Sequence, residues 1–409
     1  MEKLNTKKIL QLEQFLVDQN SVEPNKIDEL RSYEWGKINY AIINKTQYIV
    51  FLNKLFSDYA KKLLISLKQF EELLIKALFR VQNNELIDDF IVEIQQLPIK
   101  SFHILLPIYN LRLNNNQGIL GDIPLIKYNN LEQYCLNNKA VIPDICKDSL
   151  DKDKNYDGVA FVDITINARD YNYAEHQAKE KLSIIINVLN FMVGHKDKQM
   201  EISSERKKLG DEFFLGFGDT FFNISRKTDI KQPINFATFK QFAEDVKSGN
   251  NKILKLLSTE NLNELEQRIL YGVNWVGMSL MERNNAIALS EALFAVEALL
   301  QAEPGIINKS IVASLAEMVA FIVGVDYDSR IQLEEKFKNL YGLRSKITHG
   351  KGMNITDLET MEAISLAREL IYTIIKKPAF KEAKSLKAIN NYIVKMRYTV
   401  EEGEKKDGE

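Results

Sequence analysis

Arg344, four intervening residues and His349 stand at the end of a charged, helical stretch, and Gly350 follows them. An imidazole transfers protons near neutral pH, and a guanidinium holds a phosphate through two parallel hydrogen bonds. Together they are the minimum needed to cleave RNA without a metal, because the ribose 2′-hydroxyl is the nucleophile and the attacked phosphate gathers negative charge. The pair therefore indicates chemistry on a phosphodiester.

How these two side chains lie depends on where the helix ends. On a continuous helix, residues five apart lie about 140° around the axis, so Arg344 and His349 would diverge. Gly350 and Gly352 allow the helix to stop, so that the histidine can turn back. The alternative is structural: a protonated His349 and Lys346 would stabilise the negative end of the helix dipole.

The last third of the chain is predicted to be a helical bundle that carries this pair. Apolar residues recur there at three- and four-residue spacing, and Asp328 and Thr356 are suitable N-caps. The predicted helices cover residues 262–282, 284–302, 308–324, 328–348, 356–376 and 380–398. Their clearest apolar stripes are Ala286, Leu289, Leu293, Val296, Leu299 and Leu300, and then Ile311, Leu315, Met318, Phe321 and Ile322.

The chain before the bundle has three parts, which give a fold class of mainly α with a small α/β domain. Residues 1–97 are predicted to be an N-terminal helical region, because apolar residues recur at helical spacing. Residues 98–226 alternate short apolar runs with turn residues, which favours a small α/β domain. Residues 227–261 are polar and mixed, so we expect a helical connector before the bundle at 262–400. The tail 401–409 is expected to be disordered.

Within 98–226 the best strand pattern covers residues 159–166, after a turn signal at 156–158. Shorter strands are predicted at 102–106 and 108–111, and a closing hairpin at 213–224. A helix should follow Asp170, with Ala174, Ala178, Leu182, Ile185 and Leu189 on one face.

Composition narrows the classes of function. The 409 residues are 45 % hydrophobic and 27 % charged, with a formal net charge of −2, which argues against a protein that coats nucleic acid. Cys135 and Cys146 are too few for a disulfide framework and lack histidine partners at zinc spacing. No segment resembles a signal peptide or a membrane span, so we expect a cytoplasmic protein that is not membrane-bound.

Other chemistries find little support in the sequence. Motifs of P-loop nucleotide binding, zinc proteases and α/β-hydrolases are absent. The glycines at 216 and 218 suit a strand turn, since no helix with a third glycine follows. Asp144 and Asp163 could hint at a metal nuclease, but no acidic-x-Lys partner follows Asp163, so we expect no metal and no cofactor.

The runs at 288–300 and 340–350 resemble the HEPN superfamily, and most closely its Apea-like branch. The resemblance covers about residues 262–376. It implies a helical bundle that dimerises and acts as a metal-independent endoribonuclease with an R-x4–6-H motif, often in phage defence, abortive infection, CRISPR or toxin systems. Arg344 and His349 map onto that motif. Many members carry Asn, Asp or His directly after the arginine, whereas this chain has Ser345, which can donate one hydrogen bond in a supporting role.

A second match to the motif runs from Arg169 to His176, at a strand-to-helix turn of the predicted α/β domain. A surface ion pair or a helix cap explains this match better than catalysis does.

The sequence therefore predicts an endoribonuclease whose catalytic residues, Arg344 and His349, meet their symmetry mates in a homodimer. Lys346, Lys351 and Lys338 are candidates for binding flanking phosphates of the RNA, with ordinary solvated lysines as the alternative. The N-terminal helical region and the α/β domain would sense a signal or restrain the nuclease. A regulatory protein and a phage-derived trigger are the candidates for that signal. The alternatives are a HEPN-like module that binds nucleotide, RNA or protein without catalysis, and a purely structural assembly module.

Overall fold

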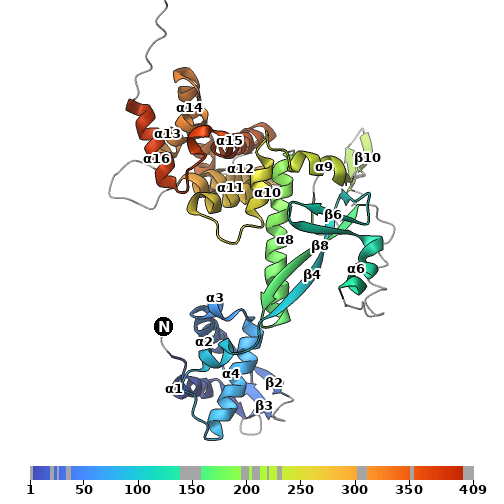
Figure 1. Ribbon diagram of the computed structural model, residues 1–409, viewed down its shortest axis with the longest axis vertical. Helices are drawn as coiled ribbons and strands as arrows, with labels where there is room; N and C mark the ends of the chain where they lie inside the picture. Colours follow the sequence, from blue (N-terminus) through green and yellow to red (C-terminus); the bar gives the residue numbers. More distant parts are fainter. Residues whose placement is uncertain are drawn as a thin grey trace, which may run out of the picture. The chain divides into compact units, whose positions relative to one another are not determined.

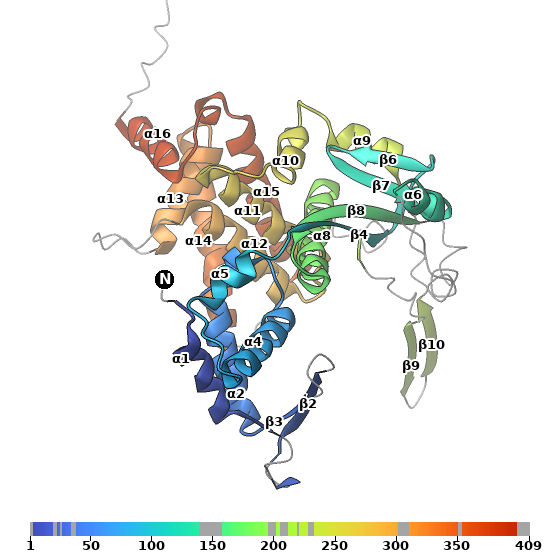
Figure 2. The ribbon, with the colours of Figure 1, turned by 60° about the horizontal axis from the view of Figure 1, so that its bottom comes forward.

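The computed structural model describes residues 3–18, 23–24, 27–33, 38–138, 158–194, 202–204, 212–218, 221–227, 233–301, 311–350 and 354–398. These residues are mainly helical with a small sheet region, which confirms the predicted fold class at that level. The chain forms two compact units, whose elements are drawn in Figure 1 and Figure 2. Unit 1 comprises Met1–Ile104 and Ile164–Glu180, and unit 2 comprises Leu105–Asp163 and Lys181–Glu409.

Unit 1 contains a three-stranded antiparallel sheet of order β1-β3-β2, so the region predicted to be helical at residues 1–97 has strands as well as helices. The strands are β1 (Leu16–Asp18), β2 (Glu29–Tyr33) and β3 (Ile38–Ile42). Three of the five residues of β3, Ile38, Tyr40 and Ile42, are β-branched or aromatic types that favour strands, but so short a run has no clear period. The unit's helices are α1 (Thr6–Ile9), η1 (Leu10–Gln14), α2 (Lys45–Ser57), α3 (Ala60–Leu63), α4 (Leu67–Gln82) and α5 (Phe90–Gln95).

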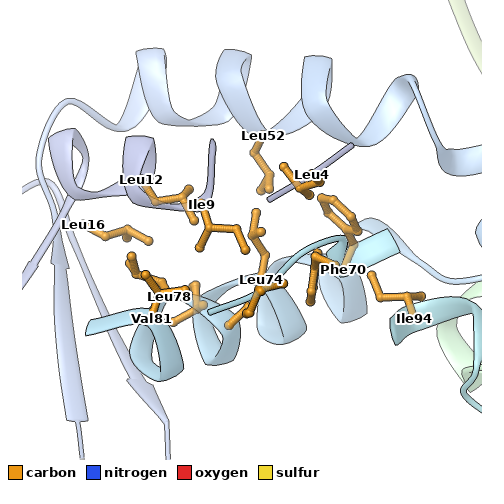
Figure 3. Packing of buried hydrophobic residues seen from close by; sticks show 14 of the residues in the cluster. Leu4, Ile9, Leu12, Leu16, Leu52, Phe70, Leu74, Leu78, Val81 and Ile94 are labelled. Carbon is orange, nitrogen blue, oxygen red and sulfur yellow. The ribbon is translucent and has the colours of Figure 1, made fainter. Parts of the chain in front are cut away.

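The core of unit 1 is built around α4. Phe70, Leu74 and Leu78 recur at four-residue spacing and are fully or almost fully buried, as the helical pattern predicts. Figure 3 shows these side chains packed against Leu4 and Ile9 from the N-terminal segment. Because α4 contributes one whole face to this cluster, unit 1 has a hydrophobic core of its own.

A four-stranded sheet of order β4-β8-β7-β6 follows in the chain. The predicted strand at 159–166 is confirmed as β8 (Val159–Ala168), and the predicted hairpin as β9 (Glu212–Gly218) paired with β10 (Phe221–Lys227). The predicted strand at 102–106 and the first two residues of the one predicted at 108–111 instead form one strand, β4 (Lys100–Tyr109), at the end of the sheet order, while Leu111 begins the short strand β5 (Leu111–Arg112). An edge strand tolerates Pro107, because its missing N–H is not needed for a ladder there. The remaining elements are β6 (Gln117–Leu120), β7 (Ile123–Lys127), η4 (Tyr128–Asn130) and α6 (Leu131–Asn137).

The helix expected after Asp170 is α8 (Tyr171–Val193), and its predicted apolar face is buried. The two units divide the chain differently from the predicted boundaries at 97 and 226, because β8 and α8 each contribute residues to both units. The predicted connector begins with β11 (Ile234–Asn235), which pairs with β5 in parallel, and continues as α9 (Phe236–Ala243) and α10 (Asn250–Leu256).

The C-terminal part of unit 2 is helical, as predicted. In both ribbon views α11, α12, α13, α14 and α15 gather in one group (Figures 1 and 2). Helix α12 packs against α11, α13, α14 and α15, and α16 against α13. Of the two predicted stripes, Ala286 and Phe321 are half-buried and Ile311 is exposed, while the other members are buried. The bounds are α11 (Glu264–Met281), α12 (Asn285–Leu300), α13 (Ile311–Val323), α14 (Tyr327–Thr348), α15 (Asp357–Lys376), η5 (Pro378–Phe380) and α16 (Leu386–Tyr398).

Helix caps explain where these helices start. Thr356 caps α15 through a capping box with Glu359, as predicted for its N-terminus. Asp328 is not the N-cap of α14: Asp326 takes that role, and its carboxylate accepts a hydrogen bond from the Ser329 N–H at 2.8 Å. The last helix starts six residues later than predicted, because a 3₁₀ turn at Pro378 precedes it. The tail 401–409 lies outside the described residues.

Within the part of the chain that the structure describes, none of the helices combines the length and the apolar character that a bilayer crossing requires.

Candidate functional site

The predicted motif lies at the C-terminal end of α14. The helix ends at Thr348 and His349 is its C-cap, with its N–H donating to the carbonyl of Ser345 at 3.1 Å. Gly350 follows with φ +68°, in the left-handed region that glycine adopts without a Cβ penalty, and its N–H donates to the carbonyl of Ile347 at 3.0 Å. The helix therefore stops at the first glycine, as the sequence predicts.

Arg344 faces α12 and is held there by charge and by two aromatic rings. Its Nη1 donates to Oε1 of Glu297 in an ion pair. Its guanidinium carbon lies 4.6 Å from the ring centre of Phe294 and 5.0 Å from that of Tyr341. The side chains of Arg344 and Glu297 are only 17 % and 15 % exposed. Contact with two rings and a carboxylate in a partly desolvated place fixes the orientation of the guanidinium.

Glu297 contacts both Arg344 and Tyr341, and the sequence analysis did not assign it a role in the site. Its Oε1 also accepts a hydrogen bond from the Tyr341 hydroxyl at 2.6 Å. Burial raises the pKa of Tyr341, and the hydrogen bond to Glu297 and its charge raise it further, so the phenol stays protonated and donates. The sequence signal was an acidic residue on a helix otherwise rich in alanine and leucine.

His349 is exposed, one residue beyond the end of α14. Between residues that the structure describes, no hydrogen bond or ion pair involves its ring, and none joins it to the side chain of Arg344. The structure thus places Arg344 against α12 and leaves the imidazole open to solvent. Both belong to one helix end, but a single chain does not bring them into direct contact.

The other predicted site residues that the structure describes are exposed on α14. Ser345 and Lys346 lie in its last turn, where a lysine also stabilises the negative end of the helix dipole. Lys338 forms an ion pair with Glu334, one turn earlier, at 2.5 Å. Lys351 and Gly352 lie outside the described residues. Lys346 is therefore the predicted phosphate-binding lysine closest in sequence to His349 within the described chain.

The second motif match is structural. The Arg169 guanidinium donates to the carbonyls of Leu63, Gln95 and Leu97 at 2.8, 2.8 and 3.1 Å. The next residue, Asp170, accepts from the Tyr173 N–H at 3.1 Å and so caps α8. This agrees with the interpretation of the match as a cap.

A metal site at Asp163 finds no support either. The carboxylate of Asp163 is buried and accepts a hydrogen bond from the Tyr134 hydroxyl at 2.7 Å. Burial and this contact raise the pKa of Tyr134 well above its usual value. Asp144 lies outside the described residues, and those that are described contain no group of three His, Cys, Asp or Glu side chains able to hold a metal ion.

Comparisons with protein-family models, with curated proteins and with solved structures found no match to this chain.

Proposed function

We propose that the C-terminal helices form a metal-independent endoribonuclease of the HEPN type, which cleaves RNA at Arg344 and His349. The observation that carries this proposal is the different environment of the two side chains. Arg344 is held between two rings and a carboxylate, while His349 stands exposed just beyond the end of the same helix. A fixed cation suits binding of a phosphate, and a solvent-open imidazole suits proton transfer.

Arg344 keeps the capacity to bind phosphate while it is paired. A guanidinium has five N–H donors, and the ion pair with Glu297 uses one of them, on Nη1. The rings of Phe294 and Tyr341 hold the plane of the group, so less freedom is lost when a phosphate binds. Glu297 is thus a positioning residue that acts through Arg344.

The reaction follows from the residue types. The 2′-oxygen attacks the adjacent phosphorus as its proton passes to a base, and the bond from phosphorus to the 5′-oxygen breaks as that oxygen receives a proton. Arg344 stabilises the charge on the pentavalent phosphate, and His349 transfers protons. The products are a 2′,3′-cyclic phosphate and a 5′-hydroxyl. DNA is resistant, because it lacks the attacking hydroxyl.

A homodimer would complete the site. One histidine does not serve both ends of the reaction well, and two-fold symmetry places a second copy of the same motif opposite the first. The exposed position of His349 leaves it accessible to a partner chain or to RNA. Lys346 and Lys338 would bind flanking phosphates, with Lys338 leaving Glu334 to do so. A role in phage defence or as a toxin rests on the family resemblance.

One observation favours a second candidate function, a bundle that binds nucleotide, RNA or protein without cleavage. The ion pair with Glu297 neutralises Arg344 in a partly buried place, as a purely structural arginine would also be neutralised. RNA affinity that falls with salt, without any cleaved product, would identify this alternative.

The direct test is cleavage of a structured RNA by the purified full chain in the presence of EDTA. Arg344→Ala and His349→Ala should each lower the cleavage rate by about 100-fold or more. Arg283→Ala and His103→Ala, at exposed positions, are matched controls that should retain full activity. Undiminished cleavage by the first two variants ends the proposal, and so does the absence of cleavage by the wild-type chain under conditions in which it binds RNA.

A further inference from the structure

Unit 1 contains a cleft of about 500 Å³ that the proposed nuclease does not use. Its volume is in the range of small-molecule sites in proteins. Apolar side chains form one side and polar side chains from the first two turns of α8 form the other. The lining residues are Phe56, Ile65, Ser66, Leu67, Asn172, Tyr173, His176 and Gln177.

The two sides of the cleft are fixed to each other by hydrogen bonds. Asp170 accepts from the backbone N–H and the hydroxyl of Ser66 at 2.7 and 2.9 Å, while it also caps α8. The backbone N–H of Arg169 donates to the carbonyl of Leu64 at 2.9 Å. Leu64 adopts φ +51°, a conformation that non-glycine residues rarely take and that concentrates at functional sites. The cleft is therefore preformed.

The apolar side offers a ring and aliphatic groups. Ile65 is fully buried and supports the wall of the cleft. Phe56 and Leu67 are half-buried, so part of each of these two side chains is available to a ligand. The Phe56 ring is held by Phe70, with ring centres 5.3 Å apart. A fixed aromatic ring beside aliphatic side chains favours a flat, apolar ligand body.

On the polar side, Asn172, Tyr173 and Gln177 offer neutral hydrogen-bonding groups. With the partners that the structure describes, neither the Asn172 amide nor the Tyr173 hydroxyl forms a hydrogen bond. Burial raises the pKa of Tyr173, and Glu180 raises it further, so the hydroxyl remains a donor. Gln177 donates its amide nitrogen to Glu180 at 2.9 Å, which turns one donor away from the ligand and leaves the carbonyl oxygen as an acceptor.

We propose that this cleft binds a neutral planar heteroaromatic molecule of the nucleobase class, as the free base or the nucleoside. An asparagine amide pairs with the donor and acceptor edge of a base, and base rings stack on aromatic side chains. The ring of the ligand lies against Phe56 and Leu67, and its polar edge forms hydrogen bonds with Asn172 and Tyr173.

The charges around the cleft select against a phosphorylated ligand. Its lining contains neither lysine nor arginine. The carboxylate of Asp170 bonds to the lining residue Ser66, and that of Glu180 accepts from Gln177 and lies 3.4 Å from Nε2 of His176. Two carboxylates near the cleft repel a phosphate, so the nucleoside binds in preference to the nucleotide.

Isothermal titration calorimetry of the full chain tests this with adenosine, guanosine, cytidine and uridine, their 5′-monophosphates, and indole as a ring with a poorer hydrogen-bonding edge. At least one nucleoside should bind saturably, and its monophosphate about tenfold more weakly. Asn172→Ala and Tyr173→Phe should each weaken nucleoside binding about three- to tenfold. Asn391→Ala, an exposed helical asparagine, is the matched control and should bind normally.

Arg344→Ala separates this site from the proposed nuclease site, since nucleoside binding in unit 1 should be unchanged in that variant. The proposal is overturned if no nucleoside binds saturably, or if indole binds as tightly as the nucleosides. It is equally overturned if Asn172→Ala and Tyr173→Phe, shown to be folded by circular dichroism, retain wild-type affinity, or if Arg344→Ala abolishes binding.

Discussion

Replacing Glu297 by glutamine tests how Arg344 is held. Glutamine keeps the size of the side chain and a carbonyl oxygen that can accept from Tyr341, but it removes the charge that pairs with Arg344. Arg344→Met is the complementary change, because methionine can still pack against Phe294 and Tyr341 without carrying a charge.

The expected magnitude follows from the exposure of the pair. At 15 % and 17 % exposed, Glu297 and Arg344 lie between a surface ion pair and a fully buried one. Surface pairs contribute about 0–1 kcal/mol, and removal of one partner of a buried pair costs about 3–5 kcal/mol. We therefore expect Glu297→Gln to lower the free energy of unfolding by about 2 kcal/mol, with a coupling energy to Arg344→Met of about 1.5 kcal/mol.

Trp275 gives a local readout of the bundle. It lies on α11 with its ring centre 5.2 Å from that of Phe294, which in turn contacts Arg344. The chain has two tryptophans, Trp35 and Trp275, so a Trp35→Phe background makes the fluorescence specific for the bundle. Urea unfolding of that background, both single variants and the double variant then gives the four free energies of a double-mutant cycle.

A coupling energy below about 0.3 kcal/mol would contradict a stabilising interaction between Glu297 and Arg344, because the two side chains would then contribute independently to the free energy of unfolding. The cleavage assay adds a second comparison. If Glu297 positions Arg344, Glu297→Gln lowers the cleavage rate by about tenfold, whereas a rate increase would mean that the carboxylate competes with the phosphate.

Three further predictions concern single positions. Gly277→Ala should lower the free energy of unfolding by about 3 kcal/mol or more, because an added Cβ would clash with the carbonyl oxygen of Asn187. Chemical denaturation measures this change, and a decrease below about 1 kcal/mol would contradict the close packing of Gly277 against Asn187. Gly350→Ala should lower the free energy of unfolding by only about 1 kcal/mol, because φ is +68° but nothing lies within 4 Å of the new Cβ. A decrease above about 3 kcal/mol would contradict the open surroundings of Gly350. The pKa of Tyr341 is raised in the folded state, so folding favours the protonated phenol. The stabilisation by this protonated phenol is fully present below the ordinary tyrosine pKa of about 10, and it is lost as the pH rises through the higher pKa of the folded state. Denaturation at pH 8 to 11 should therefore show wild type losing more stability than Tyr341→Phe, and parallel pH profiles would refute it.

Periodicity in the sequence located the C-terminal helices to within a few residues, apart from the start of α16, because each carries an apolar face at helical spacing and several begin at a polar cap. It missed the N-terminal sheet for a physical reason. Strands β2 and β3 have five residues each, too few to establish a period, and β3 is stabilised by pairing with β1, which is distant in sequence. Pro107 likewise suggested a break, whereas the edge position of β4 accommodates it.

The site shows the same limit. Residue types, spacing and the resemblance of the surrounding helices selected Arg344 and His349, but the partner of Arg344 is 47 residues away in the sequence. Only the packing of α12 against α14 makes Glu297 a neighbour of Arg344 and Tyr341. In the same way, the cleft in unit 1 depends on contacts between the turn at residues 64–66 and the start of α8, more than 100 residues apart. Long-range packing of this kind leaves no local pattern in a single sequence.

In the proposed reaction, Arg344 and His349 cleave RNA through the ribose 2′-hydroxyl without a metal. Its most direct test is the chemistry of the RNA ends formed by the full chain in EDTA, on a substrate in which one 2′-hydroxyl at the preferred cleavage position is replaced by hydrogen. We expect 2′,3′-cyclic phosphate and 5′-hydroxyl ends from the unmodified RNA, loss of cleavage at the deoxy position, and formation of such ends by His349→Ala at a rate lower by about 100-fold or more. Cleavage that persists at the deoxy position, or ends carrying a 5′-phosphate, would contradict this reaction.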